Sequence, residues 1–191
     1  MKIICIADSD NTDPQFFLKP DSALLLGRMP FFYPDFSNDI CVRPHLVVRI
    51  DKVGKSIQER FAHKYYQEVT VGLDIFARDM QQQRLNNGQP WSPSECFDGS
   101  AVLGEFVSIA DFSPTDLKIS LLKNGTEVAH YNTSALRHTI DHIISQLSHY
   151  MMFRTGDYLY TGSPVPPVAI QIGDTLEATL NSRILLACRI K

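Results

Sequence analysis

Alternation of apolar and polar residues is the dominant pattern along this chain. In residues 69–74, valine and leucine alternate with threonine, glycine and aspartate, which predicts a strand with one buried face. Residues 123–126, Lys-Asn-Gly-Thr, predict a tight hairpin turn, since Asn-Gly readily adopts the backbone conformation that such turns require. Similar patterns predict further strands at residues 117–122, 127–131, 158–161, 175–180 and 184–190.

Helical spacing of apolar residues is clear in one long segment, residues 134–151. Asn132, Thr133 and Ser134 offer capping side chains at its start. Shorter helices are predicted at residues 56–66 and 78–85, the second ending in the turn-forming Asn-Asn-Gly of residues 86–88. We therefore expect an α+β fold that is mostly β, with short helices and one long helix.

Two histidines in the predicted long helix have the spacing of metal ligands. His138 and His142 are four residues apart, as are paired ligands on one helix face. No glutamate follows His138 in an H-E-x-x-H arrangement, and both histidines lie off the apolar stripe. A solvated helix face is the favoured interpretation.

Composition and charge narrow the class of protein. A chain of 191 residues that is 44% hydrophobic can bury a full core, and we expect a single domain spanning residues 1–191. The net charge of −3 gives no reason to expect nucleic acid or an anionic membrane as a partner. The sequence shows no apolar run of transmembrane length, its start is too short for a signal peptide, and its four cysteines are scattered without a C-x₂-C pair. These features favour a cytoplasmic location.

Charged residues gather at the junction between the predicted strand 69–74 and the helix that follows. Asp74 ends the strand, and Arg78 and Asp79 open the helix. An unpaired buried carboxylate costs several kcal/mol, so a chain that places three charges here is expected to use them. We predict a functional site at this junction.

Four motifs, in order along the chain, resemble those of the fumarylacetoacetate hydrolase family. Residues 16–20, FFLKP, are similar to its F-x-K-P loop, and residues 74–81, DIFARDMQ, match its Asp-x₃-Arg-Asp-x-Gln element. Residues 132–134 resemble the start of its last long helix, and residues 156–164, GDYLYTGSP, match its GD-x₃-TG-[ST]-P element. The resemblance covers most of the chain. It implies a mixed β-sheet roll of the family's C-terminal domain type, assembled as a dimer.

The resemblance also implies a chemistry. Family members bind a divalent metal, commonly Mg²⁺ or Mn²⁺, through two Glu of an E-x-E strand and the Asp that stands here as Asp74. Hard oxygen ligands suit these cations, and the metal holds a 1,3-dicarbonyl or 2-oxo acid during carbon–carbon cleavage or tautomerisation. A His-Glu pair on an N-terminal lid activates water, and a Lys after a Pro-Trp stretch helps to carry the substrate's charge.

This chain departs from the family at each of those positions. Arg43 and His45 occupy the two Glu positions, and positions 40–50 contain no acidic residue. Only residues 8–15 separate the first strand from the F-x-K-P motif, so the lid and its His-Glu pair are expected to be absent. Glu95 stands where the family has its Lys. We therefore expect no Mg²⁺ or Mn²⁺ cofactor in this protein.

The former metal pocket, Asp74 with Arg43, His45 and Glu95, is expected to hold ion pairs instead. A guanidinium presents a fork of donors to carboxylates, so Arg43 can supply the positive charge that the metal supplies in relatives. We predict an Arg43–Asp74–Glu95 network. An alternative is a transition-metal site formed by Cys41, His45 and Asp74, which Arg43 would oppose by repelling the cation.

The residues leave three function classes open. In the first, the protein has lost metal-dependent catalysis and serves as a binding or accessory protein, as a homodimer or with an active relative. In the second, it is a metal-independent hydrolase, isomerase or decarboxylase of a 2-oxo or 1,3-dicarbonyl acid, with Arg43 as electrophile. In the third, it binds a small dicarboxylate or 2-oxo acid without turnover. Arg78 and Thr161 are the remnants of a catalytic set, and the substrate-binding candidates are Lys19, Arg43, Arg78 and Thr161. We favour the first class.

Overall fold

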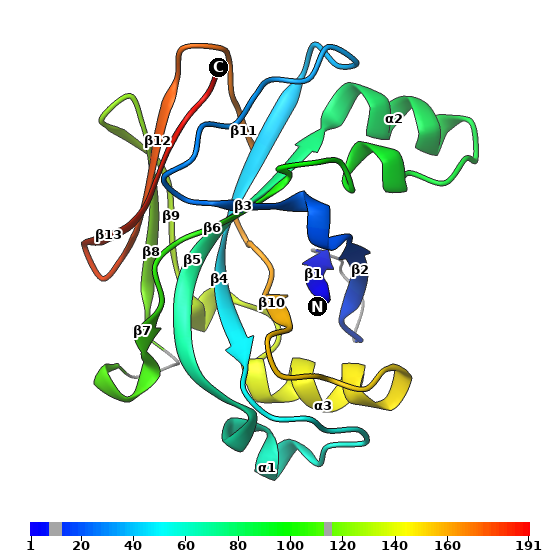
Figure 1. Cartoon of the computed structure of the whole chain (residues 1–191), viewed down its shortest axis with the longest axis vertical. Helices are drawn as coiled ribbons and strands as arrows, with labels where there is room; N and C mark the ends of the chain where they lie inside the picture. Colours follow the sequence, from blue (N-terminus) through cyan, green and yellow to red (C-terminus); the bar gives the residue numbers. More distant parts are fainter. Residues whose placement is uncertain (8–12, 113–115) are drawn as a thin grey trace.

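The structure, a computed structural model, describes residues 1–7, 13–112 and 116–191, and its strands form two sheets (Figure 1). In the larger sheet, β1 pairs with β10 and β3 with β6 in parallel, while the other neighbours are antiparallel. Its strands run in the order β2 (Gln15–Lys19), β1 (Ile3–Ala7), β10 (Tyr158–Tyr160), β4 (Ile40–Ile50), β5 (Tyr66–Ala77), β6 (Ala101–Leu103) and β3 (Leu24–Leu26), with β11 (Val168–Ala169) beside β4 and β7 (Val107–Ser108) beside β5.

The smaller sheet is antiparallel and packs against the larger one. It runs in the order β13 (Arg183–Arg189), β12 (Thr175–Leu180), β8 (Lys118–Lys123) and β9 (Thr126–Asn132). The Asn-Gly hairpin predicted at residues 123–126 joins β8 and β9, and Asn124 has the positive φ of 53° that this turn needs. The predicted fold class, mostly β with a mixed, curled sheet, is confirmed, although the strands divide between two sheets.

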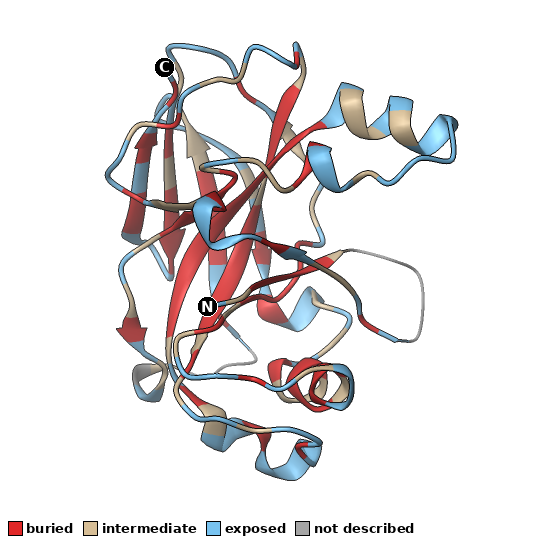
Figure 2. Ribbon diagram, turned by 45° about the vertical axis from the view of Figure 1, so that its right-hand side comes forward, coloured by how far each residue is buried: buried red, intermediate tan, exposed pale blue. Residues whose placement is uncertain are grey.

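The long pair β4 and β5 forms the centre of the molecule and is buried on both faces along most of its length, as the largely red ribbons of Figure 2 show. On one face, Leu46 of β4 and Val71 of β5 belong to the main core, which also contains residues of the smaller sheet and of the long helix, such as Ile143. The other face carries a smaller apolar cluster that includes Cys5, Val47 and Tyr160. Because successive residues of a strand point to opposite faces, β4 and β5 can hold a core on one side and a site on the other.

Helices are short, as predicted, but their bounds differ from the prediction. Residues 56–66 contain only α1 (Glu59–Ala62) and one turn of 3₁₀ helix, and α2 is Arg78–Asn86. The α2 helix projects from the body with no buried residue, which Figure 2 shows as pale blue and tan. The 3₁₀ turns are η1 (Asp21–Ala23), η2 (His63–Tyr65), η3 (Ser92–Ser94), η4 (Ile109–Asp111) and η5 (Thr133–Ala135).

The start of the long helix was predicted wrongly. It is α3 (Ile140–Tyr150), not 134–151, and its N-cap is Thr139, whose side chain accepts the amide N–H of His142 at 3.1 Å. Thr133 instead accepts the amide N–H of Leu117 at 3.0 Å, so its hydroxyl is used between strands. His138 therefore lies before the helix, where its ring stacks on that of His142 at 5.2 Å between centroids.

The F-x-K-P segment was also described wrongly as a loop. It forms the strand β2, paired along its length with β1. In a strand, Phe17 and Lys19 share one face, and both turn toward the site described below. Residues 8–12, most of the segment expected to replace the family's lid, lie outside the described residues. Within the described residues, the structure contains no helix long and apolar enough to cross a membrane.

Candidate functional site

The register of β4 and β5 creates the site by placing Arg43 directly opposite Asp74. Paired residues of antiparallel strands project their side chains to the same face, so the two charges meet there. The Asp74 side chain is 1% exposed and that of Arg43 is 14% exposed. Strand β6 pairs with β5 at the same level, Ala101 opposite Asp74, which closes the other side of the site.

Lys19 is the cation closest to Asp74. Its Nζ lies 2.7 Å from Asp74 Oδ1, and it donates hydrogen bonds to the carbonyl oxygens of Ile75 at 3.0 Å and Ser100 at 2.9 Å. Burial alone would lower the pKa of Lys19, but the Asp74 carboxylate raises it above its ordinary value. Burial alone would raise the pKa of Asp74, but Lys19 and then Arg43 lower it. Lys19 and Asp74 are therefore a fully ionised pair that the fold encloses.

Arg43 connects Asp74 to Glu95. Its Nη2 lies 3.1 Å from Glu95 Oε1, its Nε lies 3.7 Å from Asp74 Oδ2, and its guanidinium carbon lies 4.1 Å from the centroid of the Phe76 ring. Gln81, on the first turn of α2, donates to the same Glu95 oxygen at 2.7 Å. The predicted contacts of Arg43 with Asp74 and Glu95 are confirmed. The prediction lacked Lys19 as the principal partner of Asp74 and Gln81 as a partner of Glu95.

Glu95 differs from Asp74 in its proton affinity. Its side chain is 1% exposed, and its Oε2 has no hydrogen-bond partner. Burial, and then the neighbouring Asp74 carboxylate, raise the pKa of Glu95 to about 8, although Lys19 and Arg43 oppose the rise. Two buried carboxylates thus share the cations unequally, and Asp74, which lies closest to Lys19, keeps the lower pKa.

His45 is held in a form that neither binds a metal nor accepts a proton from a substrate. The backbone N–H of Gly162 donates to His45 Nδ1 at 3.1 Å, so the neutral ring carries its proton on Nε2, which lies 3.9 Å from Asp74 Oδ2. Burial lowers the pKa of His45 to about 3, so the ring is neutral near pH 7. With Nδ1 occupied and Nε2 protonated, the ring offers no free lone pair.

The residues present do not fit a divalent metal ion. Mg²⁺ and Mn²⁺ require several oxygen ligands, whereas the Asp74 carboxylate has Lys19 at 2.7 Å and Arg43 at 3.7 Å. Nor does the described part of the chain contain three His, Cys, Asp or Glu side chains placed to hold a metal. Cys41, from the alternative Cys41–His45–Asp74 site, instead contacts Asp39, its Sγ lying 3.6 Å from Oδ1, and burial raises the pKa of its thiol to about 11.

Arg78 and Asp79 lie apart from this cluster and fasten a loop. Arg78 makes two hydrogen bonds to the Asp39 carboxylate, at 2.7 and 3.0 Å, on the exposed surface. Asp79 accepts the hydroxyl of Ser37 at 2.6 Å and the amide N–H of Asn38 at 3.0 Å. The structure therefore does not bring Arg78 together with Lys19 and Arg43 as one anion-binding set.

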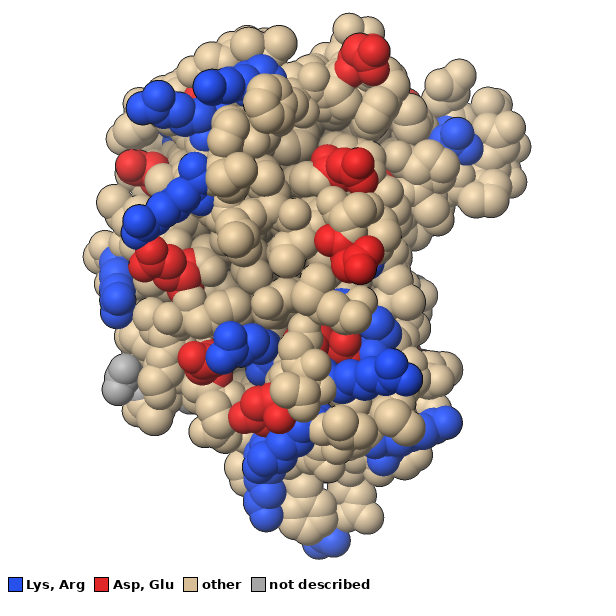
Figure 3. All heavy atoms as spheres, viewed as in Figure 1, with Lys and Arg blue, Asp and Glu red and all other residues tan. Residues whose placement is uncertain are grey.

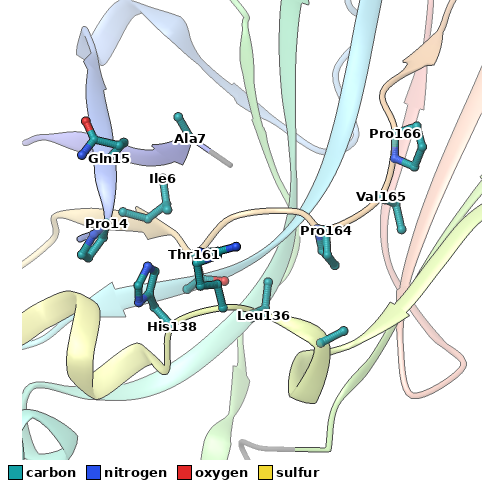
Figure 4. A pocket seen from close by; sticks show the side chains of 12 residues that line it. Ile6, Ala7, Pro14, Gln15, Leu136, His138, Thr161, Pro164, Val165 and Pro166 are labelled. Atoms are coloured by element: carbon teal, nitrogen blue, oxygen red, sulfur yellow. The ribbon is translucent and has the colours of Figure 1, made fainter. Parts of the chain in front are cut away.

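Thr161 also lies away from the charged cluster. Its neighbour Tyr160 belongs to the apolar cluster on the face that carries Asp74, so Thr161 points to the other face of the sheet. There it donates to the carbonyl of Leu46 at 3.0 Å and lines a cavity of about 490 Å³ with Ile6, Leu136 and His138 (Figure 4). Of the proposed substrate ligands, only Lys19 and Arg43 share one site.

Comparison with known proteins places these observations in a family. Residues 5–190 match the family described as Fumarylacetoacetate (FAA) hydrolase C-terminal. The chain is 30% identical over 175 residues to the oxaloacetate tautomerase YcgM of Escherichia coli (strain K12). The matched residues cover 91% of this chain and 80% of that protein. It is 29% identical over 183 residues to the mitochondrial oxaloacetate tautomerase FAHD1 of Mus musculus, covering 94% and 82%.

A solved structure agrees with the sequence matches. The fumarylpyruvate hydrolase from Pseudomonas aeruginosa in complex with Mn²⁺ and pyruvate has a TM-score of 0.91 and 25% identity, covering 100% of this chain and 89% of that one. By their names, these similar proteins are tautomerases and a hydrolase. Together with the four motifs and the sheet that carries Asp74, the matches show that this chain belongs to the fumarylacetoacetate hydrolase family.

Proposed function

We propose that this protein is a family member that does not use a divalent metal at Asp74 and does not catalyse the metal-dependent reactions of its relatives. One observation carries the proposal: Arg43 and a neutral His45, in place of two carboxylates, stand beside the buried Asp74 carboxylate, with Arg43 Nε 3.7 Å from its Oδ2. A metal ion entering there would lack two oxygen ligands and would be repelled by Arg43. The site is thus expected to stabilise the fold, and the protein to act by binding.

Metal titration tests the first half of the proposal. Isothermal calorimetry with Mg²⁺ and Mn²⁺ should give no saturable heat for the native chain. The triple variant Arg43→Glu/His45→Glu/Glu95→Lys restores the charges that the family resemblance implies, and should gain metal affinity. Micromolar affinity of the native chain that is lost in Asp74→Ala would contradict the proposal.

Turnover measurements test the second half. Oxaloacetate and fumarylpyruvate, named in the relatives, and a simple acylpyruvate should be consumed far more slowly than by active relatives. Loss of a general base alone typically costs about 10²–10⁴-fold, and the metal's charge is lost as well. A turnover number near 1 s⁻¹, within about tenfold of a median enzyme, would instead favour the metal-independent enzyme with Arg43 as electrophile.

The accessory role and the assembly state belong to the same proposal. A chain without catalysis can still serve as a subunit, either as a homodimer or paired with an active relative, or as a binder of a small dicarboxylate or 2-oxo acid. Analytical ultracentrifugation at micromolar concentration distinguishes dimer from monomer. Calorimetry with malonate and pyruvate tests the ligand, and Arg43→Gln, with Arg78→Gln as the control, tests whether Arg43 contributes to binding.

A further inference from the structure

The end of the molecule formed by α1 and the C-terminal end of α3 concentrates positive charge. Exposed lysines and arginines gather there, and Figure 3 shows blue side chains over this lower end of the molecule. Residues 51–65 and 149–156 include two carboxylates, Asp51 and Glu59, of which Glu59 contacts His142. We call the five cations of these residues the basic end: Lys52, Lys55, Arg60, Lys64 and Arg154.

This concentration opposes the net charge of the chain. Five cations against two carboxylates leave a formal excess of three positive charges at this end, so a chain with a net charge of −3 carries about −6 over the remainder. A molecule with that separation of charge orients in the field of an anionic surface, whatever its total charge. The net charge alone gave no reason to expect such a partner, and the distribution in space does.

Exposed apolar side chains stand among these cations. Val53 is 61% exposed, Met152 is 45% exposed and Phe61 is 41% exposed. Val53 and Met152 flank one antiparallel bridge, in which Gly54 and Phe153 exchange backbone hydrogen bonds of 3.1 and 2.8 Å. In this antiparallel register Val53 and Met152 lie diagonally across the bridge and project to the same face of it.

The third apolar side chain is linked directly to two of the cations. The Arg60 guanidinium lies 4.7 Å, and the Lys64 ammonium 5.0 Å, from the centroid of the Phe61 ring. Long cationic side chains around an apolar one can keep their charges at the level of lipid headgroups while the apolar group enters the interface.

We propose that the basic end docks on the surface of a bilayer that contains anionic lipids, with Val53, Phe61 and Met152 entering the headgroup region. The lower end of the molecule tapers in the view of Figure 3, and its charge is spread over several elements, which suits a broad deformable surface. Each Lys or Arg near an anionic bilayer typically adds about fivefold to binding, which corresponds to about 1 kcal/mol. This docking is independent of the charged cluster at Asp74, so its failure would leave the proposed function untouched.

Vesicle sedimentation with purified full-length chain tests the charge requirement. The chain should bind vesicles of phosphatidylcholine with phosphatidylserine, bind pure phosphatidylcholine much less, and lose affinity as salt is raised. Lys52→Gln/Lys55→Gln should bind about 30-fold more weakly, or about 1 kcal/mol per lysine. The matched control, Lys118→Gln/Arg183→Gln, removes two exposed cations from the smaller sheet and should bind as the native chain does.

A second pair of variants tests the apolar tips. Val53→Ser/Met152→Ser should weaken vesicle binding about fivefold or more, because the lost apolar surface no longer leaves water. Ile172→Ser/Ile184→Ser changes two exposed apolar residues elsewhere, 70% and 54% exposed, and should have no effect. Equal binding to both kinds of vesicle, equal losses in control and test pairs, or tighter binding to single-stranded nucleic acid than to vesicles would each overturn the proposal.

Discussion

Replacing Lys19 by methionine should destabilise the protein strongly, because it removes one partner of a buried ion pair. The variant Lys19→Met preserves the length and apolar stem of the side chain but deletes the ammonium that lies 2.7 Å from Asp74. Asp74 would then have Arg43 at 3.7 Å and a neutral His45 at 3.9 Å as its charged or polar neighbours. The carbonyl oxygens of Ile75 and Ser100 would lose the donor that Lys19 supplies.

The magnitude follows from the burial of the pair. Side chains that are 0% and 1% exposed cannot be rescued by water, and breaking such a pair from one side typically costs about 3–5 kcal/mol. The control is Arg78→Met, which breaks the pair with Asp39 whose side chains are 47% and 33% exposed. Screening by solvent limits that loss to about 0–1 kcal/mol.

Urea unfolding followed by the fluorescence of Trp91 measures both variants. Trp91 is the one tryptophan of the chain, and its ring lies 5.2 Å from that of Phe17 in the same strand as Lys19. Circular dichroism checks that the transition is global. The explanation fails if Lys19→Met costs no more than Arg78→Met.

The pH dependence of this loss has a definite sign. Lys19 lowers the pKa of Asp74, and a lowered pKa contributes stability above the ordinary value that is lost as pH falls through the folded value. Lys19→Met lacks that contribution, so its deficit should be largest at neutral pH and should shrink on acidification. Adding Asp74→Asn should recover part of the loss, since the remaining side chain carries no charge. A deficit that grows in acid would refute the assignment.

Three further predictions test Glu95, Gly72 and the start of α3. The pKa of Glu95 is raised from 4.5 to about 8, so its contribution to the unfolding free energy is full below pH 4.5 and is lost as pH rises through 8. Glu95→Gln should therefore be more stable than the native chain at pH 9, by about a few kcal/mol, and its stability in urea unfolding should vary less with pH. Gly72→Ala would place a Cβ 2.6 Å from atoms of Tyr160 and Val47, and should lower the unfolding free energy by about 1–3 kcal/mol. Unchanged stability in urea unfolding would mean that these neighbours move aside at little cost. Thr139→Ala should cost about 1 kcal/mol by removing the cap of α3, a loss that thermal melting would fail to show if the helix began near residue 134.

Local patterns in the sequence determined most of the elements and the family. Alternation in residues 69–74 predicted the central strand β5, and Asn-Gly predicted the β8–β9 hairpin, because strand periodicity and turn geometry depend on neighbours in the chain. The substitutions at Arg43, His45 and Glu95 likewise predicted that ion pairs would replace a metal site. Such inferences need residue identity and spacing only.

The tertiary structure decided which of the singled-out residues meet. Lys19 reaches Asp74 because β2 pairs with β1 and turns its inward side chain toward β5, a contact between residues far apart in the chain. A strand at residues 16–20 would put Lys19 and Phe17 on the same face. That Asp74 is the partner of Lys19 follows only from the pairing of β2 with β1. Thr161 and Arg78 were separated from the cluster for the same reason, since the face of a sheet and the direction of a helix are set by packing.

The start of α3 and the basic end show the same division. Several residues near 132–139 can cap a helix. In the structure Thr139 caps α3, whereas the hydroxyl of Thr133 accepts the amide N–H of Leu117, the residue before β8. Net charge is a property of composition. Four cations of the basic end lie within residues 52–64, and folding brings only Arg154 to them from another part of the chain. Residue identity and spacing thus indicated most of the elements, the family and the altered charges. Tertiary structure alone decided their partners, because burial and electrostatic pairing depend on distances between segments that the order of residues does not specify.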